Sequence, residues 1–156
     1  MQKITPNLWF DTEAEEAANF YTSLFEDSRI LYVMHYGDAG PRPSGMVLTV
    51  TFQLAGQEFT ALNGGPEFKF NEAISLLVNC ESQAEVDELW DKLSAGGEEG
   101  PCGWLKDKFG VSWQIVPTVL EEMLRDEDTD KANRVMTAML QMGKIDVGEL
   151  EKAYAG

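Results

Sequence analysis

The stretch "GVSWQIVP", residues 110–117, alternates large apolar side chains with Ser112, Gln114 and Val116. A repeat of two predicts a β-strand with one apolar face packed on other elements and a second, mixed face that points away from them. Gln114 lies on that mixed face. Whether such a position carries a neutral amide or a carboxylate decides whether the strand is equipped to help hold a metal ion.

The chain carries a strand–helix unit twice, at an offset of about 69 residues. In each copy a short apolar strand precedes a segment whose apolar residues recur at helical spacing. Both helices start with a hydroxyl residue followed three positions later by Glu, the pattern of a capping box. These pairs are Thr12 with Glu15 and Ser82 with Glu85. The shared pattern predicts a duplicated module.

Further strand patterns follow each helix, at residues 29–36, 45–56 and 57–63 in the first half, and as a short piece before residue 102 and at 110–117 in the second. The fold class expected is therefore α+β, with paired βαβββ modules and a C-terminal helical tail. Within a single domain of residues 1–156, the first module covers 1–68, the second 69–117 and the tail 118–156. Thr118 with Glu121 predicts a capping box, and Asp146 a cap of the last helix.

The charge of the chain excludes several classes of partner. Lys and Arg total 12 against 27 Asp and Glu, a formal charge of -15, and this field repels phosphate backbones and anionic lipid surfaces. No run approaches the roughly 18 apolar residues of a membrane span. Cys80 and Cys102 fit reduced thiols better than a disulfide framework. We therefore expect a soluble cytoplasmic protein with no nucleic-acid and no membrane partner.

Four stretches in order carry a resemblance to a known family: "LWFDTEAEEAANFYTSLF" (8–25), "FTALNGGPEFKFN" (59–71), "CESQAEVDELWDKLSAGG" (80–97) and "GWLKDKFGVSWQIVP" (103–117). Together they resemble the PhnB-like branch of the glyoxalase/bleomycin resistance/dioxygenase superfamily, the vicinal oxygen chelate fold. The resemblance extends to the tail "AMLQMGKIDVGELEKAYAG" (138–156). It implies curved sheets that form a cup with the site inside, and a homodimer. It does not by itself give a reaction.

Metal-dependent members of that superfamily hold one divalent ion with His, Glu or Gln side chains from both modules. The resemblance puts these four positions near Pro6, Ala61, Ala73 and Gln114, and three of them carry no donor side chain. The single histidine, His35, would be an isolated donor. We therefore predict no metal and no cofactor.

Gln114 has two readings that the sequence leaves open. As an amide it offers two donors and one acceptor without a charge, which suits a hydrogen bond to a ligand, but equally a bond to neighbouring strands. The mixed face of residues 47–53 is likewise either pocket lining or solvated surface. The predicted ligand-binding residues are Gln114, Ser75, Thr49, Thr51, Asn63, Phe10 and Trp104, with no catalytic residue assigned.

Three functions of different classes remain. The first, which we favour, is a PhnB-like small-molecule-binding protein without a catalytic metal, with a role in sequestration or resistance and an unknown ligand. The second is a metal-dependent lyase or dioxygenase of the same superfamily. The third is a dimeric scaffold with no small ligand. The sequence leaves open whether the protein is an enzyme.

Overall fold

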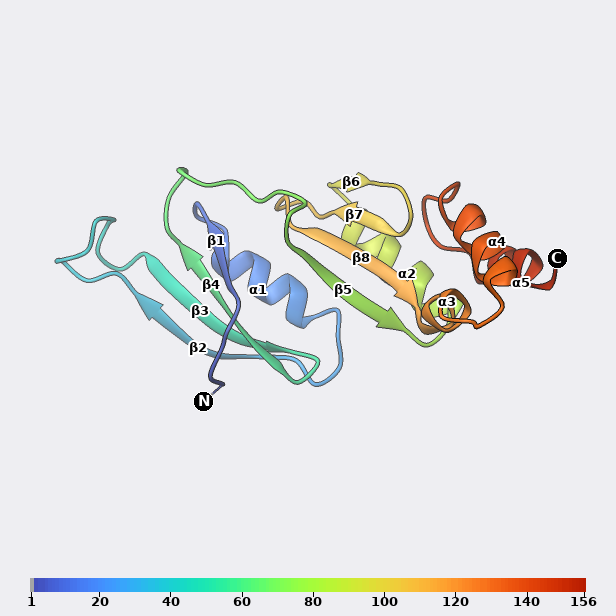
Figure 1. Cartoon of the computed structure of the whole chain (residues 1–156). Helices are drawn as coiled ribbons and strands as arrows, with labels where there is room; N and C mark the ends of the chain where they lie inside the picture. Colours follow the sequence, from blue (N-terminus) through green and yellow to red (C-terminus); the bar gives the residue numbers. More distant parts are fainter. Residues whose placement is uncertain (1) are drawn as a thin grey trace. The chain divides into compact units, whose positions relative to one another are not determined.

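The structure is a computed structural model that describes residues 2–156. The chain forms two compact units, the first ending at Phe70 and the second running from Asn71 to Gly156. Each unit contains one sheet and the helix that covers it (Figure 1).

The first unit has the order strand, helix and three strands. Its elements are β1 (Asn7–Phe10), α1 (Ala14–Thr22), β2 (Arg29–His35), β3 (Val47–Leu54) and β4 (Gln57–Asn63). The strand order across the sheet is β1-β4-β3-β2, and only the β1–β4 pair is parallel among these strands. Ala55 (φ 47°) and Gly56 (φ 84°) make the β3–β4 connection. Positive φ at both residues is typical of a two-residue type I′ hairpin turn.

Helix α1 packs on one face of this sheet. The rings of Tyr21 on α1 and Phe52 on β3 are 6.4 Å apart, and Phe52 stacks on Phe59 of β4. Side chains at paired positions share a face. The helix-covered face therefore includes Phe10 and Asn63, which are paired in the β1–β4 register. The other face, which we call the open face of the first sheet, carries Asn7, Trp9, Thr49, Thr51, Thr60 and Leu62.

The start of α1 differs from the expected capping box. The residue before the helix is Glu13, which makes no side-chain cap bond, and Thr12 with Glu15 does not form the reciprocal pair. Asn63 Oδ1 instead accepts a hydrogen bond from the Ala14 backbone N–H at 2.9 Å. A side chain 49 residues away thus satisfies a helix donor that the local sequence was expected to satisfy.

The second unit repeats the order of the first and adds a helical tail. Its elements are β5 (Ser75–Cys80), α2 (Gln83–Ser94), β6 (Glu98–Glu99), β7 (Trp104–Lys106), β8 (Ser112–Pro117), α3 (Thr118–Leu124), α4 (Thr129–Met139) and α5 (Val147–Ala155). The strand order is β5-β8-β7-β6, again with its first pair parallel (Figure 1).

Helix α2 starts as the sequence predicts and covers one face of the second sheet. Ser82 Oγ accepts a hydrogen bond from the Glu85 N–H, although the Glu85 carboxylate reaches the Glu81 N–H and not that of Ser82. The buried residues of α2 pack towards β7 and β8, whose side chains on this face include Leu105, Trp113 and Ile115. The alternation in residues 110–117 is therefore a true strand alternation.

A buried carboxylate fixes the turn between β7 and β8. Asp107, 2% exposed, accepts hydrogen bonds from the backbone N–H groups of Phe109 and Val111 and from the indole Nε1 of Trp113. These three donors satisfy the hydrogen-bonding capacity of the buried Asp107 carboxylate with groups from its own turn and from β8. The turn consequently holds the start of β8 in a defined register.

The tail makes its own small core. Leu120, Met123, Val135, Ile145 and Leu150 are buried together, with Met139 and Met142 packed against them. Asp146 caps α5 through the Glu149 N–H at 3.1 Å, as predicted. The predicted Thr118–Glu121 capping box is absent, because α3 begins directly at Thr118 after Pro117 and the cap residue offers no acceptor side chain.

The predicted fold class is confirmed: the order of elements is that of two βαβββ modules followed by a helical tail, an α+β architecture. Within residues 2–156, no helix combines the length and the apolar character that a membrane crossing requires.

Candidate functional site

The face of the second sheet that α2 does not cover carries most of the polar side chains of interest. It is called here the open face of the second sheet and consists of Ser75, Leu77, Trp104, Lys106, Ser112 and Gln114. The register sets Lys106 and Ser75 on either side of Ser112. It sets Trp104 and Leu77 on either side of Gln114 in the same way. A polar row and an amphipathic row therefore lie next to each other.

A cavity of about 210 Å³ opens among the strands β6, β7 and β8. Trp104, Lys106 and Ser112 of the open face line it, together with the carboxylate residues Glu72, Glu98 and Glu99. Its size is below the range of roughly 300 Å³ and more that drug-sized ligands occupy. The cavity therefore suits a small organic molecule or one end of a larger one.

Ser112 is the polar group of this cavity that the protein leaves unsatisfied. The residue is 1% exposed, and its Oγ has no hydrogen-bond partner among residues 2–156. A buried hydroxyl without a partner costs about 1–3 kcal/mol, and nearly all such groups in folded proteins have a partner. A ligand that bonds to Ser112 Oγ would remove that cost.

Lys106 and Glu72 form an ion pair at the same cavity. The contact lowers the pKa of the Glu72 carboxyl, chiefly through the hydrogen bond from Lys106, and raises the pKa of Lys106 for the same reason. Both groups are thus charged at neutral pH and largely neutralise each other. Glu98, the register partner of Lys106 on β6, adds a second carboxylate beside the lysine.

Gln114 and Ser75, both predicted as ligand-binding residues, come together. Gln114 Nε2 donates a hydrogen bond to Ser75 Oγ at 2.9 Å. The interaction joins β8 to β5. Of the two roles that the sequence allowed for Gln114, it therefore makes the bond to a neighbouring strand. Trp104, half-buried, is the register partner of Gln114 and lines the cavity.

The predicted residues of the first unit divide between the two faces of its sheet. Thr49 and Thr51 lie on the open face. The sequence alone did not determine to which side of the sheet these two side chains point. Phe10 and Asn63 lie on the helix-covered face. Phe10 packs edge-on against Phe70. The Asn63 side chain accepts a hydrogen bond from the Ala14 N–H and donates one to the Val47 carbonyl.

Sequence reasoning missed Ser112, Lys106 and Glu72 as a group. The alternation that singled out Gln114 also assigns Ser112 to the same face, so that signal was present. The pairing of Lys106 with Glu72 had no such signal, because the two residues are distant in sequence and meet only when β5 and β7 align on either side of β8.

The donor chemistry of the strands differs from that of a transition-metal site. Of the positions that the resemblance assigned to metal ligands, Ala61 lies on the helix-covered face, and its neighbour Thr60 faces the open side. Pro6 and Ala73 precede their strands, where Asn7 and Ser75 take the open faces. Amides and hydroxyls are poor ligands for such ions compared with imidazole, thiolate and carboxylate. Among residues 2–156, no three His, Cys, Asp or Glu side chains gather in a group fit for a metal ion.

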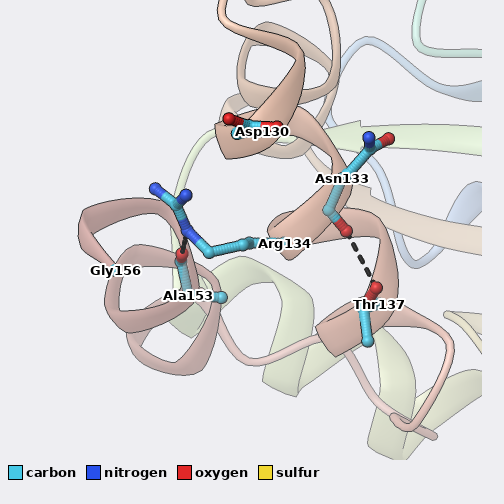
Figure 2. A pocket seen from close by; sticks show the side chains of 6 residues that line it. All are labelled: Asp130, Asn133, Arg134, Thr137, Ala153 and Gly156. Carbon is cyan, nitrogen blue, oxygen red and sulfur yellow. Dashed lines mark hydrogen bonds between the residues drawn. The ribbon is translucent and has the colours of Figure 1, made fainter.

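A second cavity, of about 570 Å³, lies between α4 and α5, and the Arg134 and Thr137 side chains that line it are already bonded within the protein (Figure 2). Arg134 Nε and Nη2 donate to the carbonyl oxygens of Ala153 and Tyr154, each at 2.9 Å. Thr137 Oγ1 donates to the Asn133 carbonyl. Arg134 thus caps the end of α5, a structural role. The cavity beside Ser112 is therefore the better candidate site.

Comparisons with known proteins identify the family. The model of a family described as 3-demethylubiquinone-9 3-methyltransferase matches residues 2–116, so α3–α5 lie beyond the matched range, although the resemblance was expected to include the tail. A PhnB protein from Bacillus cereus is 42% identical, with a TM-score of 0.68, over 75% of this chain and 100% of that one. No curated protein matches.

Two more distant structures share the fold. A Pseudomonas aeruginosa protein is 21% identical over 75% of this chain and 98% of its own, with a TM-score of 0.61. The fosfomycin resistance protein FosX from Listeria monocytogenes is 17% identical over 80% of this chain and 98% of its own, with a TM-score of 0.54. At such identities the likeness supports the architecture and no activity. The family model and the 42% identity to the PhnB protein show that the chain belongs to the PhnB-like family of the glyoxalase/bleomycin resistance/dioxygenase superfamily.

Proposed function

We propose that this protein binds a small organic molecule in the cavity beside Ser112 and that it does so without a catalytic metal. The proposal takes residues 1–156 as one domain of the PhnB-like family. Ser112 carries it: the hydroxyl is 1% exposed, lines the cavity and has no partner within the described chain. Stability alone does not explain such a group, because Ala in its place would cost nothing in hydrogen bonds.

The lining supports a ligand with both apolar and polar parts. Trp104 offers a large aromatic surface, and Ser112 a donor and an acceptor in the same cavity. Small-molecule sites in proteins commonly pair an apolar wall with a few fixed polar groups. The Gln114–Ser75 bond supports this arrangement by tying β8, the strand that carries Ser112, to β5.

The absence of a metal in this proposal rests on donor chemistry. On the open faces, the strands that correspond to the metal-binding strands of the superfamily carry Asn7, Thr60, Ser75 and Gln114. None of these is a strong ligand for a divalent transition ion. Elemental analysis of the purified protein tests this part, and a stoichiometric transition metal would contradict it.

Ser112→Ala gives the sharpest test of the binding site. Because the hydroxyl has no protein partner, we expect the free energy of unfolding in urea to stay equal or to rise. Binding of benzyl alcohol, followed through the Trp104 indole signal in ¹H–¹⁵N NMR spectra, should weaken in the same variant. Ser44→Ala, in an exposed loop, is the matched control and should change neither quantity.

Two results would refute the proposal. One is a clear loss of stability in Ser112→Ala, which would mean that the hydroxyl supports the fold. The other is a failure of benzyl alcohol, benzylamine and benzoate alike to shift the Trp104 signal at millimolar concentration.

A further inference from the structure

The cavity beside Ser112 has an unbalanced charge, and this imbalance bears on the kind of ligand that it takes. Glu72, Glu98 and Glu99 line it with a single cationic residue, Lys106. The Glu99 carboxylate belongs to the helix-covered face, so the acidic groups on the cavity side of the sheet are those of Glu72 and Glu98. Because Lys106 pairs with Glu72, one positive and one negative charge cancel locally. The Glu98 carboxylate then remains in excess on the cavity side of the sheet.

Glu98 and Glu99 point to opposite faces of the sheet. Glu99 Oε1 accepts a hydrogen bond from the indole Nε1 of Trp90 at 3.0 Å, which holds that carboxylate on the face that α2 covers. Glu98 faces Lys106 across the β6–β7 pair and is exposed to solvent. The formal charge of the whole chain, -15, adds a long-range field of the same sign.

The unpartnered hydroxyl of Ser112 is a separate reason to place a ligand here. Its burial and lack of a partner do not depend on the surrounding charges. Trp104 adds a third feature, since the face of an indole attracts cations more strongly than any other side-chain ring.

Resting on the proposed function, we infer that the cavity selects organic cations: small molecules in which an ammonium group accompanies an aromatic or apolar part. The ammonium is attracted by Glu98, the apolar part lies against Trp104, and a polar atom bonds to Ser112 Oγ. Anionic ligands are disfavoured, because Lys106 is already paired with Glu72.

Three probes that share a benzyl or phenyl ring and differ in charge test the inference. They are benzylamine, benzyl alcohol and benzoate, titrated at pH 7 and low salt while the Trp104 indole signal is followed by NMR. Benzylamine should bind about fivefold more tightly than benzyl alcohol, the gain of one partly exposed ion pair. The preference should fall as salt is added, and benzoate should bind most weakly.

Variants locate the preference in this cavity. Glu98→Gln should lower the affinity for benzylamine towards that for benzyl alcohol. Glu151→Gln removes the same charge from the exposed face of α5 and should leave the preference unchanged. Glu72→Gln leaves Lys106 without its partner and should raise the affinity for benzoate.

The outcomes separate the inference from the proposed function. If benzyl alcohol or benzoate binds the wild-type cavity as tightly as benzylamine, selection for cations is wrong while small-molecule binding stands. If Glu98→Gln and Glu151→Gln reduce benzylamine binding equally, the preference comes from overall charge and the inference is again wrong. If none of the three probes binds, both proposals fail.

Discussion

Gln114 Nε2 donates a hydrogen bond to Ser75 Oγ at 2.9 Å and so joins β8 to β5 on the open face of the second sheet. The superfamily resemblance assigned a metal-ligand position to Gln114. In this chain its amide donates to a neighbouring strand. The bond fixes β5 against β8, the strand whose Ser112 lines the candidate site.

A double-mutant cycle measures this bond. We expect Gln114→Ala and Ser75→Ala to show a coupling of about 1 kcal/mol in the free energy of unfolding, the net value of an ordinary hydrogen bond. Urea denaturation of the wild type, both single variants and the double variant gives the number. Additive losses would mean that water replaces each partner without cost.

Asn63 should be a larger contributor to stability. It is 2% exposed and its side chain accepts from Ala14 N–H and donates to the Val47 carbonyl. Asn63→Ala leaves the buried Ala14 N–H and the part-buried Val47 carbonyl unpaired, so we expect a loss of about 2–4 kcal/mol in urea denaturation. Asn19→Ala, at an exposed position of α1, should change stability by less than about 0.5 kcal/mol. Equal effects of the two changes would contradict the capping role of Asn63.

The two cysteines should react at different rates with a thiol reagent. Cys80 is fully buried, and burial raises the pKa of its thiol to about 12. Since the thiolate is the reactive form, Cys80 should stay unmodified at pH 8 in the folded protein. Cys102 is partly exposed and should react first. Cys102→Ser should therefore abolish the fast phase with a chromogenic disulfide, and a fast phase that survives would place reactivity at Cys80.

The Lys106–Glu72 pair predicts a specific pH dependence. The folded state lowers the pKa of Glu72, so this carboxylate stabilises the fold above the usual glutamate value of about 4.3 and loses the effect as the pH falls through the lowered value. NMR titration of the Glu72 side-chain carboxyl should give a midpoint below the usual range. Lys106→Gln should move that midpoint upwards. An unchanged midpoint in this variant would show that Lys106 does not set it.

Strand and helix identity came from local patterns. The alternation in residues 110–117 gave the two faces of β8, and the repeated spacing of apolar residues gave two equivalent modules. Such patterns can be recognised in the sequence because each depends only on residues within a few positions of one another, along one helical turn or one strand. The cap at Ser82 was readable for the same reason, and the four family stretches identified the superfamily.

The α1 cap and the candidate cavity could not be predicted in this way, because both are formed by residues that are distant in sequence. Local spacing predicted Thr12 as the cap of α1, but Asn63 from β4 takes that role, because β1 and β4 pair side by side. Phe10 and Asn63 lie under α1, a placement that alternation alone did not determine, since a strand has two equivalent faces until a helix covers one. The burial of the Ser112 hydroxyl without a hydrogen-bond partner is evident only in the folded sheet. The ion pair of Lys106 with Glu72 likewise depends on strand pairing. The sequence determined the elements through short-range periodicity, and the tertiary structure decided which side chains share a cavity.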